Sequence, residues 1–233
     1  MDLAKLHDEA ERRGITRLCH FTPSRNLALI ARDKIGVLST ARLLDEERPT
    51  LKPTDAERVD RHLDYISCTI EYPNPWYFRG ARDKERVFRD WVILFIRPGY
   101  LWAPGTLFCP RNAAAGCGTG MKPGYEAFMA LFAHEVQGYQ LYVREPARLD
   151  CCPTDNQAEV MIPNEIRLTD ITGVCVRSEE QAQREYTRLE YLPVNPSDFT
   201  FIIAPALFDA NAVSVAIGAG RRPLEEAWTP QWT

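Results

Sequence analysis

Short apolar and polar segments alternate along the chain and predict a mixture of strands and helices. The run over 91–96 is apolar at nearly every position, which is typical of a strand buried on both faces. Strands are predicted over 15–21, 65–71, 91–96, 140–143, 171–176 and 199–203, and helices over 1–14, from Pro23, 76–89, 125–135 and 179–192. Because these elements follow one another irregularly, we expect an α+β fold rather than an alternating α/β fold.

The segment 153–163, Pro-Thr-Asp-Asn-Gln-Ala-Glu-Val-Met-Ile-Pro, leaves a polar loop and enters an apolar, β-prone run. If the segment is extended, Gln157, Glu159 and Met161 lie on one face, because strand side chains alternate. A carboxylate and an amide at the start of a buried strand favour a polar cleft over a core. A solvated edge strand is the alternative that the spacing leaves open.

The length of 233 residues is enough for one sizeable core, and no repeat or boundary divides it, so a single domain over 1–233 is predicted. The net charge of −4 provides no general attraction for nucleic acid, so any such binding requires local basic patches. No apolar run approaches the roughly 20 residues of a membrane helix, and the charged N-terminus is unlike a signal peptide. We therefore expect a cytoplasmic protein that does not contact a membrane.

The pattern of cysteine and histidine argues against a metal site. Seven cysteines include no CxxC pair, and four histidines include no HExxH spacing. We expect reduced thiols, several of them buried, and no bound metal.

Two features have an ordinary explanation when taken alone. His20 stands at the end of a predicted strand, where a histidine is commonly structural. The charged stretch 42–64, with a short predicted helix from Thr54, reads as a solvated surface loop that carries Arg48, Arg58 and Arg61.

The order of several short motifs is more specific than any one of them. They are Cys19-His20-Phe21-Thr22 with Asn26-Leu27, Arg58-Val59-Asp60, Ser67-Cys68-Thr69-Ile70 with Tyr72-Pro73-Asn74, Trp91 with Leu101-Trp102, Phe108 with Asn112-Ala113-Ala114, and 153–160. From about residue 15 to about 178, this order resembles the DarT family of DNA-base ADP-ribosyltransferases, the toxin half of DarT–DarG systems.

The resemblance implies an ADP-ribosyltransferase fold with two small β-sheets around an NAD cleft and with peripheral helices. It implies NAD as the co-substrate and no metal. Glu159 matches the catalytic glutamate, His20 the histidine of the nicotinamide pocket, and Arg58 an arginine at the NAD phosphates or the reacting centre. The implied NAD-binding residues are His20, Phe21, Thr22, Asn26, Arg58 and Gln157. Arg48 and Arg61 are alternatives to Arg58.

The chemistry of NAD suits these residue types. Cleavage of the nicotinamide–ribose bond passes through an oxocarbenium-like state, as glycoside hydrolysis does. The Glu159 carboxylate is suited to stabilise that positive charge, to hold the ribose 2′-hydroxyl and to accept a proton from the attacking base. An arginine such as Arg58 is a natural bidentate partner of a phosphate.

The implied acceptor is guanine or thymine in single-stranded DNA, and the motifs around Asn112 and Glu159 favour guanine. A single-stranded base is read by stacking and by hydrogen bonds to its edges. The aromatic and basic residues predicted to bind DNA are Trp76, Arg79, Arg82, Tyr142 and Arg144, although residues 76–89 are equally consistent with an ordinary surface helix. The implied protein partner is a macrodomain-type, DarG-like antitoxin, and the implied effect is a block of replication in the host or during phage attack.

Two departures from the family pattern bear on the choice of acceptor. Arg61 stands where glycine is usual, and Tyr72-Pro73-Asn74-Pro75-Trp76 replaces a more common Phe-Pro-Asn turn. The alternatives are an ADP-ribosyltransferase that acts on RNA or protein and a catalytically silent nucleic-acid-binding domain.

Overall fold

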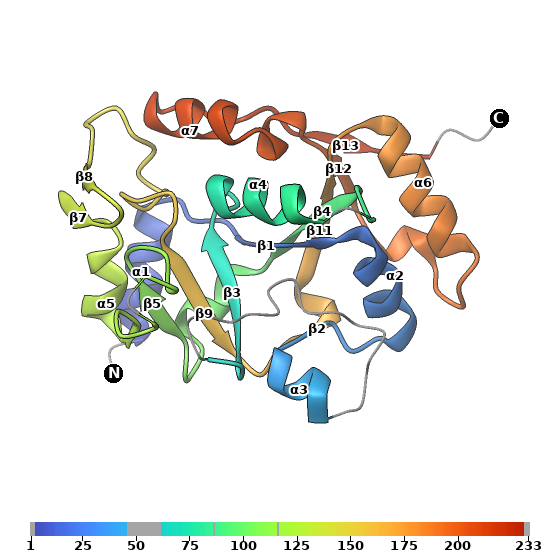
Figure 1. The fold of residues 1–233 in the computed structure, drawn as a ribbon, viewed down its shortest axis with the longest axis horizontal. Helices are drawn as coiled ribbons and strands as arrows, with labels where there is room; N and C mark the ends of the chain where they lie inside the picture. The colour runs from blue at the N-terminus through green and yellow to red at the C-terminus, as the bar shows by residue number, and fades with distance from the viewer. Residues whose placement is uncertain (1–2, 46–61, 86, 116, 231–233) are drawn as a thin grey trace.

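A computed structural model of the protein describes residues 3–45, 62–85, 87–115 and 117–230 (Figure 1). The helices are α1 (Leu3–Arg12), α2 (Ser24–Asp33), α3 (Thr40–Asp45), α4 (Pro75–Lys84), α5 (Tyr125–Ala130), α6 (Glu179–Glu190) and α7 (Ala210–Gly218). The strands are β1 (Leu18–Pro23), β2 (Val37–Leu38), β3 (Tyr65–Ile70), β4 (Trp91–Ile96), β5 (Leu107–Cys109), β6 (Lys122–Pro123), β7 (Glu135–Gln137), β8 (Leu141–Val143), β9 (Glu159–Pro163), β10 (Glu165–Ile166), β11 (Ile171–Val176), β12 (Phe201–Ile203) and β13 (Glu226–Trp228). The predicted α+β class is confirmed.

The central sheet has nine strands in the order β13-β12-β11-β4-β1-β3-β9-β5-β6. Its pairs are antiparallel apart from β11 with β12. β1 pairs with β4 along its whole length but with β3 at only two positions, Leu18 with Ile70 and Cys19 with Thr69. The sheet therefore consists of two halves joined by a short seam between β1 and β3, which corresponds to the expected pair of small sheets.

The predicted buried strand 91–96 is confirmed as β4, which is buried at every position. α4 covers this part of the sheet through Phe78, whose ring stacks on Phe21 with the centroids 4.6 Å apart and meets Trp91 edge-on at 5.8 Å. Figure 1 shows α4 lying across β1 and β4. This aromatic cluster fixes the middle of β1, the strand that also carries His20.

A buried carboxylate holds the seam together. Glu71 follows β3 with no exposed surface and with a left-handed backbone, φ 62°. Its Oε1 accepts hydrogen bonds from the backbone N–H and hydroxyl of Thr16 and from the N–H of Arg17, and its Oε2 accepts one from Arg222 at 3.0 Å. Arg17 lies 3.7 Å above the ring of Phe95 and pairs with Glu225. The C-terminal segment thus fastens the start of β1 to the end of β3.

The element boundaries differ from the predictions where tertiary contacts intervene. β1 begins at Leu18 rather than at residue 15, since Thr16 and Arg17 bond to Glu71. α5 ends at Ala130 rather than 135, because residues 135–137 form β7. α4 ends at Lys84 rather than 89. The short helix predicted from Thr54 lies outside the described residues.

α7 was not predicted, because its sequence is rich in alanine and glycine and has no polar stripe. A capping signal is nevertheless present, since Asp209 Oδ1 accepts the N–H groups of Asn211 and Ala212, both at 2.9 Å. None of the described helices is long and apolar enough to cross a membrane.

The seam predicts a large loss of stability when Glu71 is replaced by alanine. The substitution leaves the Thr16 N–H and the Arg222 guanidinium without their buried acceptor, which costs about 3–5 kcal/mol in such pairs. Urea unfolding measures the change, with exposed Glu190→Ala on α6 as the control. A difference between the two variants below about 1 kcal/mol would contradict the role given to Glu71.

Candidate active site

Glu159 is the first residue of β9 and is only 6% exposed. β9 lies between β3 and β5, and Cys109 of β5 pairs with Glu159, so the edge-strand alternative is wrong. Met161 shares the face of Glu159, as predicted, and packs with Cys109 and Ala113 in a small cluster. Val160 and Ile162 on the opposite face join the main core, also as predicted. Glu159 is therefore a buried carboxylate inside the sheet.

Ser67 connects Glu159 with His20 across the seam. The Ser67 hydroxyl donates to Glu159 Oε2 at 2.8 Å, and the Ala113 N–H lies 3.4 Å from Oε1. The Ser67 carbonyl bonds to His20 Nδ1 at 2.9 Å. Because a carbonyl only accepts, Nδ1 carries the proton of this bond. The two predicted residues His20 and Glu159 thus both form hydrogen bonds with Ser67.

Ser67 was not predicted as a site residue, although it belongs to one of the motifs quoted above. The signal was its place on a mostly buried strand, where Ser67 and Thr69 are the polar positions of one face. The register pairs Ser67 with Met161, which directs its side chain to the same face as Glu159.

The other predicted residues of β1 and α2 divide between two faces. Asn26 donates to the hydroxyl of Thr22 at 2.8 Å, and both side chains are buried. Thr22 shares a face with His20 because strand side chains alternate. Phe21 points the other way, into the aromatic cluster with Phe78. The Phe21 ring thus lies away from His20, and the predicted part of Phe21 in NAD binding stays a prediction.

Gln157 lies in a turn before β9, so the prediction that it shares a strand with Glu159 is wrong. Its N–H donates to Asp155 Oδ1 at 2.8 Å, and its side chain lies near the hydroxyl of Tyr142. Burial raises the pKa of the Asp155 carboxyl. The pKa of Tyr142 is also raised, first by burial and then by the charge of Asp155. Gln157 and Tyr142, both half-exposed, thus form one polar group beside the start of β9.

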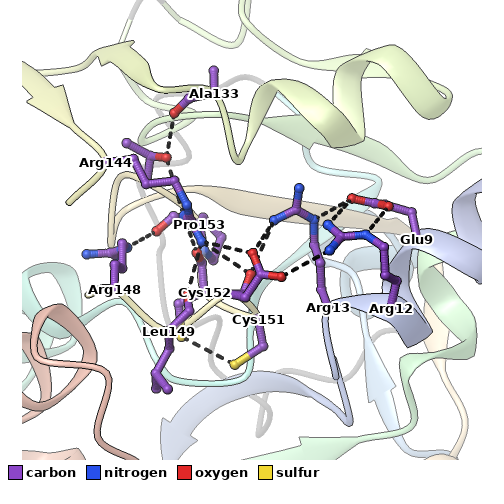
Figure 2. A network of polar contacts seen from close by, with 12 residues as sticks. Glu9, Arg12, Arg13, Ala133, Arg144, Arg148, Leu149, Cys151, Cys152 and Pro153 are labelled. Carbon is purple, nitrogen blue, oxygen red and sulfur yellow. Dashed lines mark hydrogen bonds and ion pairs between the residues drawn. The ribbon is translucent and has the colours of Figure 1, made fainter. Parts of the chain in front are cut away.

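Arg144 has a structural role in the loop that follows β8, and its predicted contact with DNA stays a prediction. Figure 2 shows its guanidinium among the carbonyls of the loop that follows β8. It donates to Cys152 O at 2.8 Å and to Leu149 O at 3.1 Å, and burial lowers its pKa. Arg148 beside it donates to Pro153 O at 2.7 Å. Both arginines fasten the loop that leads to Glu159.

The predicted DNA-binding residues on α4 also divide into two groups. Arg82 donates to Phe208 O at 2.7 Å and stacks over Phe78, so its guanidinium is engaged within the protein, and its contact with DNA stays a prediction. Trp76 and Arg79 are exposed, and the Arg79 guanidinium lies 4.9 Å from the centre of the Trp76 ring. This pair remains a suitable surface for a stacked base.

Three predicted arginines, Arg48, Arg58 and Arg61, lie outside the described residues. Within the described part of the chain, no group of three or more His, Cys, Asp or Glu side chains could hold a metal ion. All seven cysteines are among the described residues and are free thiols.

A family model described as ssDNA thymidine ADP-ribosyltransferase, DarT, matches residues 19–202. Among solved structures, Thermosipho africanus DarTG in complex with ADP-ribose is similar with a TM-score of 0.55 and 15% identity, over 83% of this chain. The match spans 51% of that DarTG chain, or about half its length. No curated protein matches the sequence.

Thermus sp. 2.9 DarT in complex with ADP-ribosylated ssDNA is similar with a TM-score of 0.53 and 14% identity, over 84% of this chain and 97% of that chain. The same protein in complex with NAD+ gives a TM-score of 0.50 and 15% identity, over 76% of this chain and 90% of that chain. At these identities the structures show a shared fold, and the family model covers most of the sequence. The chain therefore belongs to the DarT family of ssDNA ADP-ribosyltransferases.

Proposed function

We propose that this protein transfers ADP-ribose from NAD to a base of single-stranded DNA, with Glu159 as its catalytic residue. The observation that carries the proposal is the buried Glu159 carboxylate. The Ser67 hydroxyl donates to this carboxylate and orients it, and the Ser67 carbonyl bonds to His20. A carboxylate in the interior of a sheet is costly unless it is used or paired. Here it belongs to a member of a transferase family, and the motif resemblance implies that Glu159 is the catalytic glutamate.

The side chains around Glu159 fit NAD as a co-substrate. NAD supplies the ADP-ribosyl group and nicotinamide as the leaving group. His20, Thr22 and Asn26 on β1 and α2 are proposed to bind the nicotinamide side, and Arg58 to bind phosphate. Thermus sp. 2.9 DarT has been solved with NAD+ and with carba-NAD+, which supports the assignment of this co-substrate.

The proposed role of Glu159 is electrostatic. Its carboxylate stabilises the positive charge that develops at the anomeric carbon, and it accepts a proton from the acceptor as the new bond forms. The Ser67 hydroxyl holds one carboxylate oxygen at 2.8 Å, so the group is oriented before the substrate binds.

The proposed acceptor is a base in single-stranded DNA, stacked on Trp76 beside Arg79, with Tyr142 and Gln157 close to Glu159. The Thermus protein solved with ADP-ribosylated ssDNA supports this class of acceptor. Guanine, which the sequence motifs favour, and thymine, which the family description names, are the two candidate bases.

We further propose that residues 1–233 act as one domain and that a DarG-like macrodomain antitoxin restrains the enzyme. The similarity to a DarTG chain supports this pairing, and the seven free thiols support a reducing, cytoplasmic location. A block of replication, in the host or during phage attack, follows from modified template bases.

Transfer to DNA is tested by incubating the protein with NAD and short single-stranded oligonucleotides, each lacking one of the four bases. Mass spectrometry should show the addition of one ADP-ribose to every oligonucleotide except the one that lacks the acceptor base. Glu159→Ala should lower the rate on the order of 10²–10³-fold, because an electrostatic contribution at the reacting carbon is lost.

Glu165→Ala is the matched control, since this glutamate lies on β10 with its side chain 45% exposed. Equal rates for the two variants would reject Glu159 as the catalytic residue. Modification of RNA or protein pools in the absence of DNA modification would replace the proposed acceptor.

Trp76→Ala should weaken the binding of single-stranded DNA by about 1–3 kcal/mol, because each stacked base contributes that much. Fluorescence anisotropy of a labelled oligonucleotide measures the change in Kd. Tyr191→Ala is the control, since this aromatic residue follows α6 and is 86% exposed. The stacking role fails if Trp76→Ala binds as tightly as the control.

A further inference from the structure

A chain of hydrogen bonds connects the turn before Glu159 to α7. Arg148 donates to Pro153 O at 2.7 Å and to Asn156 Oδ1. Asn156 in turn donates through Nδ2 to the hydroxyl of Ser214 on α7 at 3.2 Å. The same loop is held at its other end, where the Leu149 N–H donates to Ile217 O at 3.1 Å. Figure 2 shows Arg148 reaching Pro153, and Figure 1 shows the loop after β8 passing to the end of α7.

Glu159 and Gln157 are held by different parts of the structure. Glu159 belongs to the β-ladder, where Cys109 pairs with it and Ser67 orients its carboxylate. Gln157 precedes the ladder and depends on the turn, in which Asp155 Oδ1 accepts its N–H at 2.8 Å. Loosening the turn therefore displaces Gln157 while the ladder keeps Glu159 in place.

Gln157, two positions before Glu159, and Tyr142 on β8 are partly exposed polar side chains beside this turn. Glu159 itself is buried, so a large acceptor has to approach past half-exposed groups such as these. A water molecule, in contrast, reaches a buried carboxylate without guidance from the turn.

We propose that Arg148, Asn156 and Ser214 are positioning residues that hold Gln157 for the incoming base. α7 lies beyond the matched residues 19–202, so a segment outside the family core sets how well the acceptor is aligned. The inference rests on the proposed transfer to DNA. Arg148, Asn156 and Ser214 then determine how ADP-ribose is divided between DNA and water.

The two competing reactions share one bond cleavage and differ in the bond that forms. In both, the bond from the anomeric carbon to nicotinamide breaks, and its electron pair leaves with nicotinamide. In transfer, a nitrogen lone pair of the base forms the new bond and the base loses a proton. In hydrolysis, water oxygen forms the bond and water loses the proton. Transfer needs the base in a defined orientation, so it depends more strongly on positioning.

The measurement is the ratio of DNA-linked to free ADP-ribose after the full-length protein acts on labelled NAD and an oligonucleotide that contains all four bases. This ratio does not depend on the amount of folded enzyme, so it separates positioning from a general loss of stability. Ser214→Ala removes one neutral hydrogen bond, and the ratio should fall about fivefold. Asn156→Ala removes the contacts to both Arg148 and Ser214, and the ratio should fall roughly tenfold or more.

Two further variants serve as controls. Val215→Ala changes the neighbouring, 62% exposed residue of α7 and should leave the ratio unchanged. Asn156→Asp keeps an acceptor for Arg148 and for the Ser214 hydroxyl, so it should restore most of the ratio lost in Asn156→Ala. An unchanged ratio in both Ser214→Ala and Asn156→Ala overturns the inference. Absence of DNA-linked ADP-ribose with the wild-type protein overturns the proposed function itself.

Discussion

The structure depends on one buried carboxylate, Glu71, at the seam between the two halves of the sheet. β1 and β3 pair at only two positions there, so backbone hydrogen bonds alone connect the halves weakly. Thr16, Arg17 and Arg222 surround the carboxylate with donors, which compensates the cost of its burial. Ionic contacts as well as backbone hydrogen bonds therefore connect the two halves. The donors come from residues 16–17 and from Arg222, which lie far apart in the sequence.

The same seam creates the candidate active site. Beyond Cys19 and Thr69, β1 and β3 no longer pair, and side chains connect them instead. Ser67 uses its carbonyl for His20 and its hydroxyl for Glu159, so residues from both halves meet at the opening. A continuous ladder would have used that carbonyl for a backbone bond. The incomplete pairing that weakens the sheet is thus what allows the side chains of the candidate site to converge.

Patterns in the sequence predicted those structural features that depend on neighbouring positions alone. The apolar run of β4 and the alternation that separates Met161 from Val160 were both readable from the sequence. The burial of Glu159 was ambiguous, because a carboxylate at a strand start fits an edge as well as an interior position until the strand order is known. The contacts of Phe21 depend on Phe78, which is distant in the sequence, and those of Arg144 depend on the path of the irregular loop after β8, which no local motif specifies.

The contacts at the seam join residues far apart in the sequence, which determines when they can form during synthesis of the chain. Glu71 and Arg222 are 151 positions apart, and Arg17 and Glu225 are 208 positions apart. Contacts of such long separation form only when both partners exist and the intervening chain has closed. A nascent chain that ends before residue 222 has no arginine for the Glu71 carboxylate. Assembly of the seam therefore waits until residues 222 and 225 have been synthesised.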